Sequence, residues 1–274
     1  MTLSLQLKQA VSVPVEVEEI LPESVRDKSL AEIERLNLFH GNRRLPLAEL
    51  FKVTGSADDQ SLRWQGDLSG VHWIGTKMTV GEIVVEGDAG RHLGSEMSGG
   101  EIQVHGKAGD WVGGEMRGGL IHVHGSAGHL VGAAYRGSQR GMSGGTILVD
   151  GSVGNEIGHT MRRGLIAVGG EAGDLVGFSM LAGTILVFGE AGIRHGAGMR
   201  RGTIGLWSET EPSMLPSFRR ACRIRPLAIG MVLADLRRRG FSVPERLDRC
   251  QFDLYNGDFI EGGRGELLVA ALRK

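Results

Sequence analysis

Hydrophobic and small residues between positions 66 and 205 recur with a period of nineteen. The stretch "GDAGRHLGSEMSGGEIQVHG" (87–106) can be laid over "GKAGDWVGGEMRGGLIHVHG" (106–125) without a gap. A Gly-x-Ala/Val-Gly turn opens each copy, at steps of 19, 19, 26, 19 and 19: Gly87, Gly106, Gly125, Gly151, Gly170 and Gly189. A looser copy opens at Gly66. Repetition of this kind indicates one structural unit stacked on the next.

Apolar residues occupy the same places in each copy. The isoleucine column is Ile83, Ile102, Ile121, Ile147, Ile166, Ile185 and Ile204. The valine column follows two residues later: Val85, Val104, Val123, Val149, Val168 and Val187. A small-residue column runs from Ala89 to Ala191, and a methionine column from Met78 to Met199. Residues two apart in a strand share a face, whereas the residues between the two columns vary freely. The pattern therefore predicts a strand with one buried face and one open face.

Nineteen glycine-rich residues are too few for the two helices of an α-solenoid repeat. They suffice for one turn of a parallel β-helix, in which equivalent side chains form ladders. We predict an all-β fold, a parallel β-helix of about seven coils with a period of 19. The left-handed hexapeptide type is disfavoured because the period is not a multiple of six. Glycines are expected at positive φ or where coils approach closely.

The two flanks lack the repeat. Within the second, "PLAIGMVLADLRRRGF" predicts an amphipathic helix that ends at Gly240. The open ends of a stack expose strand edges, which must be covered. We expect an N-terminal cap or docking segment (1–61), the β-helix (62–207) and a C-terminal cap with a helix (208–274), all packed on one core.

Composition adds little beyond glycine, of which there are 45 in 274 residues. Their strict register argues against a disordered low-complexity chain. The net charge of −1 and pI of about 6.8 give no indication of nucleic-acid or membrane partners. Cys222 and Cys250 have no metal-ligand spacing, which favours reduced thiols in the cytoplasm. No signal peptide is visible, and the longest apolar run (226–234) is far shorter than the ~20 residues of a membrane span.

Few residues suggest chemistry. The glycine turns precede strands and not a Lys-Ser/Thr helix start, so a P-loop is disfavoured. One polar column contains Glu86, His105, His124 and Asp150, which could share a metal if stacked. The same column ends in Gly169 and Phe188, which favours an outward polar ladder. We therefore expect no catalytic, cofactor-binding or metal-binding residue in this chain.

Arginines follow the methionine column: Arg117, Arg136, Arg162, Arg163, Arg200 and Arg201. In-register stacking would place them on one side of the rod. They form either a basic stripe for an acidic partner or polyanionic chain, or a solvated face that keeps the rod soluble.

The step of 26 contains an insertion within "GAAYRGSQRGMSGG" (132–145). Both "YRG" and "MSGG" resemble the corner of a coil, so about seven residues within 133–141 are expected to loop out. A loop leaving a regular rod is either a docking element or a neutral insertion. For docking, Tyr135 would supply an aromatic anchor, and Arg136 and Arg140 polar contacts.

The repeat "GEAGDLVGFSMLAGTILVFGEAG" (170–192) resembles the Gly-xx-Gly-xxx-Gly domain found in glutamate synthase large subunits and in the C subunit of formylmethanofuran dehydrogenase. The flanks favour the second family. "HGNRRLPLAELFKVTG" (40–55) is similar to the lead-in of this C subunit, and "LYNGDFIEGGRGELLV" (254–269) resembles its closing segment. The resemblance therefore covers nearly the whole chain.

This resemblance implies a right-handed β-helix that scaffolds other subunits and has no active site of its own. The implied partners are the A, B and D subunits of the same complex. The first is a zinc-dependent amidohydrolase-like protein and the last a formyltransferase. Together they would move a formyl group from tetrahydromethanopterin to a methanofuran-type carrier and release formate. The resemblance links this reaction to the bacterial complexes of the family. Arginine outnumbers lysine 25 to 6, which favours a bacterial source.

Three alternatives remain open. The chain could be the C subunit of a tungsten or molybdenum formylmethanofuran dehydrogenase, or a free-standing glutamate synthase structural domain. As a third possibility, it could be an enzyme itself and bind pterin through the arginine stripe.

Overall fold

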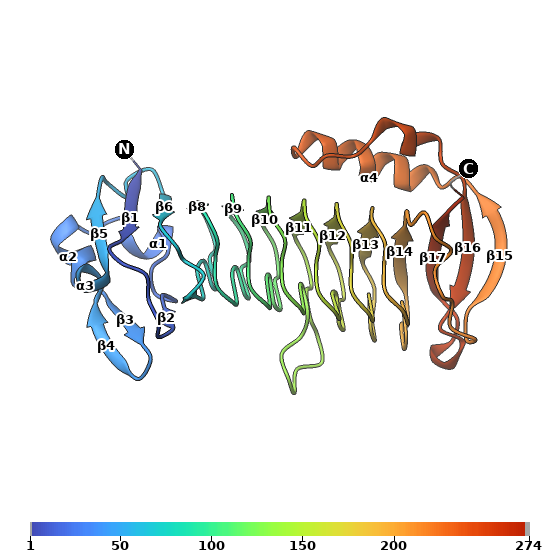
Figure 1. The fold of residues 1–274 in the computed structure, drawn as a ribbon, viewed down its shortest axis with the longest axis horizontal. Coiled ribbons are helices and arrows are strands. Elements are labelled where there is room, and N and C mark those ends of the chain that lie inside the picture. Colours follow the sequence, from blue (N-terminus) through green and yellow to red (C-terminus); the bar gives the residue numbers. More distant parts are fainter. Residues whose placement is uncertain (1, 272–274) are drawn as a thin grey trace.

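A computed structural model describes residues 2–271, leaving aside the side chains at positions 246 and 248. The fold is mostly strand, with few helices, as expected from the sequence. The repeat forms a row of parallel strands, which with the turns between them we call the coil stack (Figure 1). Its strands are β6 (Ser61–Gln65), β8 (Glu82–Glu86), β9 (Glu101–Val104), β10 (Leu120–Val123), β11 (Thr146–Val149), β12 (Leu165–Val168), β13 (Thr184–Val187) and β14 (Gly202–Leu206).

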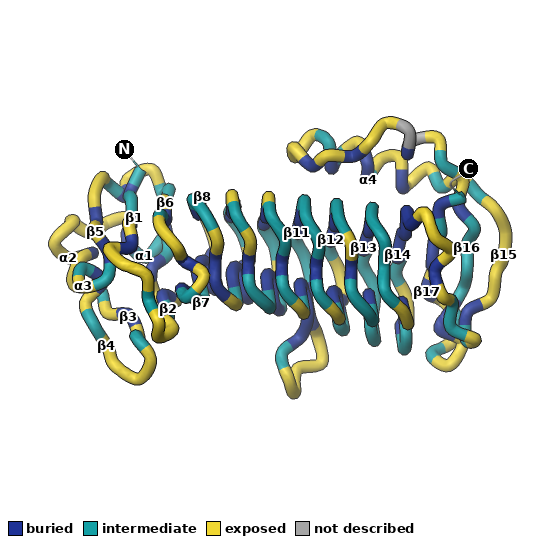
Figure 2. The backbone as a smooth tube through the Cα atoms, in the orientation of Figure 1, coloured by how far each residue is buried: buried dark blue, intermediate teal, exposed yellow. Residues whose placement is uncertain are grey.

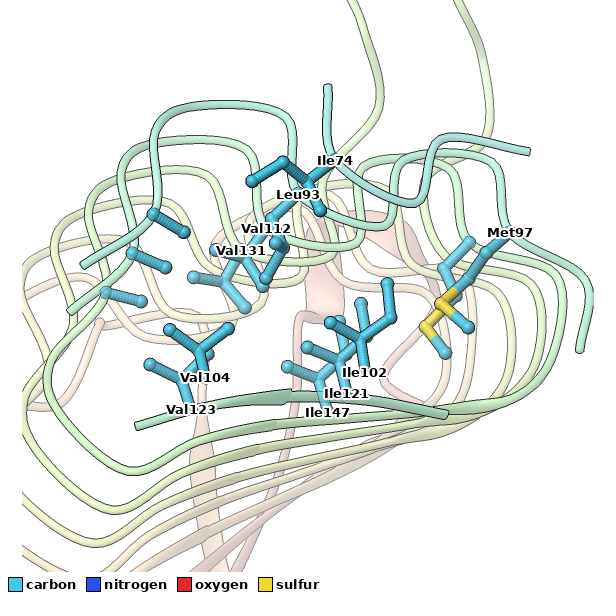
Figure 3. Packing of buried hydrophobic residues seen from close by; sticks show 14 of the residues in the cluster. Ile74, Leu93, Met97, Ile102, Val104, Val112, Ile121, Val123, Val131 and Ile147 are labelled. Carbon is cyan, nitrogen blue, oxygen red and sulfur yellow. The ribbon is translucent and has the colours of Figure 1, made fainter. Parts of the chain in front are cut away.

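The strands pair so that equivalent residues lie side by side. Ile102 is the register partner of Ile83 and of Ile121, and the valine column pairs in the same way. The isoleucine, valine and methionine columns are all fully buried, at 0% exposure. Figure 3 shows them packed inside successive turns of the chain. The sequence columns are therefore the core, as predicted.

A second side of each turn is held by single-residue pairing. The small-residue column forms parallel bridges from Ala89 to Ala108 and on to Ala127, and again from Val153 to Ala191. The backbone N–H of Ala108 donates to the carbonyl of Ser126 on the next turn at 2.9 Å. Hydrogen bonds between neighbouring turns therefore run along more than one side of the stack.

Both predicted roles of glycine occur. Gly113 has φ +60°, and a Cβ there would lie 2.5 Å from the Cδ1 atom of Ile147. Gly125 has no positive φ, but its Cβ would lie 2.5 Å from the carbonyl oxygen of Gly106. The first position needs glycine for its conformation and the second for the close approach of two turns.

The N-terminal flank extends the stack. Strand β1 (Leu3–Leu7) pairs in parallel with β6, placing Leu3 beside Leu62, and β5 (Phe51–Thr54) forms the outer edge. A smaller sheet lies beside it, in the order β4-β3-β2-β7. The remaining elements are β2 (Val15–Glu16), α1 (Pro22–Val25), α2 (Leu30–Glu34), β3 (Asn37–His40), β4 (Arg43–Pro46), α3 (Leu47–Leu50) and β7 (Val71–His72).

The C-terminal flank also continues the main sheet. Strand β17 (Gly265–Ala270) pairs in parallel with β14, placing Leu267 beside Ile204. Beyond it, β16 (Phe252–Gly257) and β15 (Arg219–Ile224) add antiparallel strands. The short helices η1 (Glu245–Arg249) and η2 (Phe259–Glu261) flank β16. Each flank thus covers an open end by prolonging the sheet.

Helix α4 (Leu227–Arg238) is followed by Gly240 at φ +81°, close to the predicted end. It lies along the side of the stack (Figure 1) and not on the same core. Leu233 and Leu236 pack on the outward-facing Leu148 and Leu186 in a second hydrophobic cluster. The predicted open face is therefore wrong for this part of the stack, where Leu148 and Leu186 are fully buried. Figure 2 shows buried positions on the side of α4 that faces the stack. No helix within residues 2–271 has the length and hydrophobicity needed to cross a bilayer.

The inward assignment of the valine column predicts the effect of Val123→Asp. The variant places an unpaired carboxylate where exposure is 0%, at a cost of about 3–5 kcal/mol. We expect loss of soluble, folded protein by circular dichroism. The matched control, Val84→Asp, places the same charge on the outward face of β8 beside Arg63, and should fold normally. Equal behaviour of the two variants would contradict the assignment.

Candidate functional site

Between β8 and β14 the turn of nineteen residues is interrupted once, between β10 and β11. The N–H of Glu115 donates to the carbonyl of Ala133 (3.1 Å), and the N–H of Ala134 to that of His159 (3.2 Å). Both bonds follow the pattern of the other turns. Met142 is fully buried in the methionine column. The loop is therefore residues 135–141. These are the seven residues by which the step of 26 exceeds the regular step of 19. Of the two candidate segments, "MSGG" forms the corner of the coil and "YRG" belongs to the loop. These seven loop residues lie within the predicted range 133–141.

Tyr135 begins this loop and is turned back onto the stack. Its ring stacks on Trp111, with 4.7 Å between centroids and 18° between planes. Its hydroxyl lies 2.9 Å from Nδ1 of His92 and 2.7 Å from Oγ of Ser95. Burial raises the pKa of Tyr135 to about 12. Tyr135 is half-buried and fastens the loop to its own chain.

The surface that receives Tyr135 is an aromatic column that the sequence reasoning missed. Trp73, His92 and Trp111 occupy the same place in successive turns, each at a φ near +65° (65°, 64° and 66°). Trp73 and His92 stack at 3.9 Å with 7° between planes. Burial is the main reason that the pKa of His92 is lowered to about 4, and the neighbouring His72 and Arg91 lower it further. The spacing of nineteen could have revealed this column, but Leu130 continues it and obscures its aromatic character.

A basic groove lies beside the loop. Its volume is about 440 Å³, and its lining residues are Glu115, Arg117, Ser138, Arg140, Gly141, Ser143, Arg162 and Arg163. Arg117 also pairs with Glu96, its Nη2 atom 3.1 Å from Oε2. The arrangement concentrates positive charge in a polar hollow, which suits an acidic partner surface.

The predicted arginine stripe is gathered only in part. Arg117, Arg162 and Arg163 line the groove, and Arg140 joins them from the loop. Arg136 is exposed on the loop outside the groove. Arg200 lies further along the stack and pairs with Glu261 (Nε–Oε2 3.0 Å), next to Arg201. The stripe therefore divides into a groove set and a separate C-terminal pair.

The polar column is divided as well. Glu86 pairs with Arg63 at 3.0 Å. The rings of His105 and His124 are 5.5 Å apart. Asp150 lies against two imidazoles: its Oδ2 is 2.8 Å from Nδ1 of His124, and its Oδ1 is 3.0 Å from Nε2 of His122. His122 was missed because it stands among the variable positions between the isoleucine and valine columns.

Comparison with known proteins gives a consistent result, although no protein-family model matches the chain. It is 44% identical over 92 residues to the C subunit of the tungsten-containing formylmethanofuran dehydrogenase 2 of Methanococcus maripaludis, covering 33% of this chain and 34% of that protein. It is 41% identical over 90 residues to the C subunit of the molybdenum-containing formylmethanofuran dehydrogenase 1 of Methanosarcina barkeri, covering 31% and 30%. The matches thus span only a third of these curated relatives.

A solved structure is similar over the whole chain. The formyltransferase/hydrolase complex (FhcABCD) from Methylorubrum extorquens, crystallised with methylofuran, contains a chain that superposes with a TM-score of 0.90. The identity is 31%, and the match covers 98% of this chain and 100% of that chain. Both flanks are therefore included in the similarity.

The half-buried position of His92 predicts a pH dependence of stability. Its pKa is about 4 in the folded chain against an ordinary value of 6.5. Between these values the unfolded chain binds the proton and the folded chain does not, so the free energy of unfolding falls as the pH is lowered. Burial of His195 and His72 lowers their pKa values in the same direction.

Urea unfolding between about pH 7 and pH 4 measures this dependence. His92→Phe keeps a ring between Trp73 and Tyr135 but removes the titrating group. The variant should lose less stability than the wild type over the same pH interval. An identical dependence in both would contradict the assignment to His92.

Proposed function

The chain belongs to the family that unites the C subunits of formylmethanofuran dehydrogenases with their counterpart in the formyltransferase/hydrolase complex, and on this premise we propose that it is the C subunit of a formyltransferase/hydrolase assembly. Such an assembly would transfer a formyl group from tetrahydromethanopterin to a methanofuran-type carrier and release formate. The observation that carries the proposal is the similarity over 98% of this chain and 100% of the other.

Within the assembly, the chain acts as a scaffold. The partner A, B and D subunits carry the zinc-type metal site and bind the two one-carbon carriers, while this chain contributes no catalytic residue. The filled interior supports this role, since the isoleucine, valine and methionine columns are at 0% exposure. A solid stack held by backbone hydrogen bonds keeps docking surfaces at fixed separations.

For the fold, we propose a right-handed parallel β-helix over residues 62–207, with residues 1–61 and 208–274 as its end segments. In-register parallel pairing of β8 to β14 supports the coil arrangement. Right-handedness follows the strong preference of parallel strands for right-handed crossovers.

Partner docking is proposed at the loop and the basic groove. Residues 136–140 are exposed, and the groove beside them brings four arginines together with one glutamate. A partner with an acidic surface would complement this charge and be guided to it. Because Tyr135 holds the start of the loop, the loop would be ordered before a partner arrives, which limits the entropic cost of docking.

A second candidate is the C subunit of a formylmethanofuran dehydrogenase, which the 44% identity to the Methanococcus maripaludis protein favours. That identity covers 33% of the chain, whereas the crystallised neighbour covers both flanks. The second observation supports the formyltransferase/hydrolase setting.

Affinity purification of the full chain from its own cells separates the candidates. We expect formyltransferase and amidohydrolase-like subunits in stoichiometric amounts. Recovery of a molybdenum or tungsten pterin enzyme would favour the second candidate. Recovery of glutamate synthase subunits, or formate release by the isolated chain, would overturn the proposal.

Deleting residues 135–141 tests the loop directly. Ala134 and Met142 should then join in the register of the other turns, so the chain should still fold. We expect weaker binding of at least one partner protein, by about 1 kcal/mol or more, measured by calorimetry with each partner separately. Unchanged affinity for every partner would identify the loop as a neutral insertion. Unfolding would show that the register between Gly132 and Gly145 is misassigned.

Charge reversal tests the groove. The double variant Arg162→Glu and Arg163→Glu replaces two of its arginines without touching the core, and should lower partner affinity about tenfold. A matched control, Arg43→Glu and Lys52→Glu, makes the same charge change on exposed positions of β4 and β5. If the two double variants bind partners equally well, docking does not use the groove.

A further inference from the structure

Three side chains with metal-binding atoms meet on the outer surface of the stack. They are His122 and His124, at and just beyond the end of β10, and Asp150, just beyond the end of β11. One ligand atom from each lies within 4.8 Å of the other two. In the described part of the chain, this is the one such group of three or more histidine, cysteine, aspartate or glutamate residues.

The register of the strands brings these residues together. His122 and His124 are two apart in an extended segment and therefore share a face. Val123 pairs with Val149, so the next residues, His124 and Asp150, lie side by side on adjacent turns. The enlarged turn of 26 residues starts and ends at this pair.

We propose that His122, His124 and Asp150 bind a divalent transition-metal ion of the Zn²⁺ type. Imidazole nitrogen and carboxylate oxygen are usual zinc ligands, with metal–ligand distances of about 2.0–2.2 Å. Tetrahedral geometry then separates the ligand atoms by roughly 3.3–3.5 Å. Both imidazoles already lie against the Asp150 carboxylate, Nε2 of His122 3.0 Å from Oδ1 and Nδ1 of His124 2.8 Å from Oδ2, and one ligand atom from each residue lies within 4.8 Å of the others.

The surroundings hold the first ligand and leave an approach to the site. The His122 side chain is 6% exposed, and its ring lies 4.1 Å from that of His124 and 6.4 Å from that of Phe241. Packing of this kind fixes an imidazole in one orientation. His124 and Asp150 are 36% and 31% exposed, so an ion can enter from solvent.

A fourth coordination position is left for water or for His105. The His105 ring belongs to the preceding turn and lies 5.5 Å from the ring of His124. The bound ion would tie the turn of β10 to that of β11, where the chain makes its longest detour. Such a link offsets part of the entropy lost on closing the larger loop. The role is structural and does not depend on the proposed function.

Zinc titration of the full-length chain, without a histidine tag and treated with chelator, tests the site. We expect one Zn²⁺ per chain with a micromolar or lower dissociation constant. His124→Gln and Asp150→Asn should each weaken binding about tenfold or more, and His122→Gln likewise. The control is His159→Gln, because His159 has a single carboxylate partner, Glu156, at 3.6 Å. This variant should bind zinc as the wild type does.

Thermal unfolding gives a second measurement. Saturating Zn²⁺ should raise the melting temperature of the wild type and of His159→Gln, but not of His124→Gln, by preferential binding to the folded state. His124 and Asp150 are partly exposed, so their variants should fold even if His122→Gln does not. Absence of one-to-one binding, or undiminished binding by His124→Gln or Asp150→Asn, would overturn the proposal.

Discussion

In-register stacking of one turn on the next is the constraint on which the structure depends. Each turn must place Ile on Ile, Val on Val and Met on Met, because parallel pairing puts the same position of two turns side by side. The same constraint explains the glycines. At Gly125 any side chain would collide with the backbone of the turn before it, so the spacing between turns leaves no alternative.

The single insertion respects this constraint and collects the distinctive chemistry of the surface. The chain departs after Ala134 and returns at Met142, so the core columns continue unbroken. On one side of the enlarged turn lie Tyr135, the aromatic column and the arginine groove. At its two ends lie His124 and Asp150, which meet on the outer surface. A regular rod thus gains a recognisable position along its length, which a scaffold needs if different partners are to bind at different places.

The sequence predicted the core columns, the period and the helix at 227–238, since these follow from residue type and spacing alone. It could not predict that α4 folds back over β11 to β13, because Leu148 and Leu186 looked like members of a variable set. It also missed the direction of Tyr135, which is set by stacking on Trp111, and the nearness of His122 to Asp150. These contacts join turns or flanks through side chains, and a linear pattern does not encode which side chains meet across space.

The central claim is that this chain organises a formyl-transferring assembly without taking part in its chemistry. The most direct test is to combine the purified A, B and D subunits with and without the full chain, and to measure formate release together with the mass of the particles formed. We expect that a stable particle forming formate requires the chain, while the chain alone releases none. Full activity of the same particle in its absence would contradict the claim.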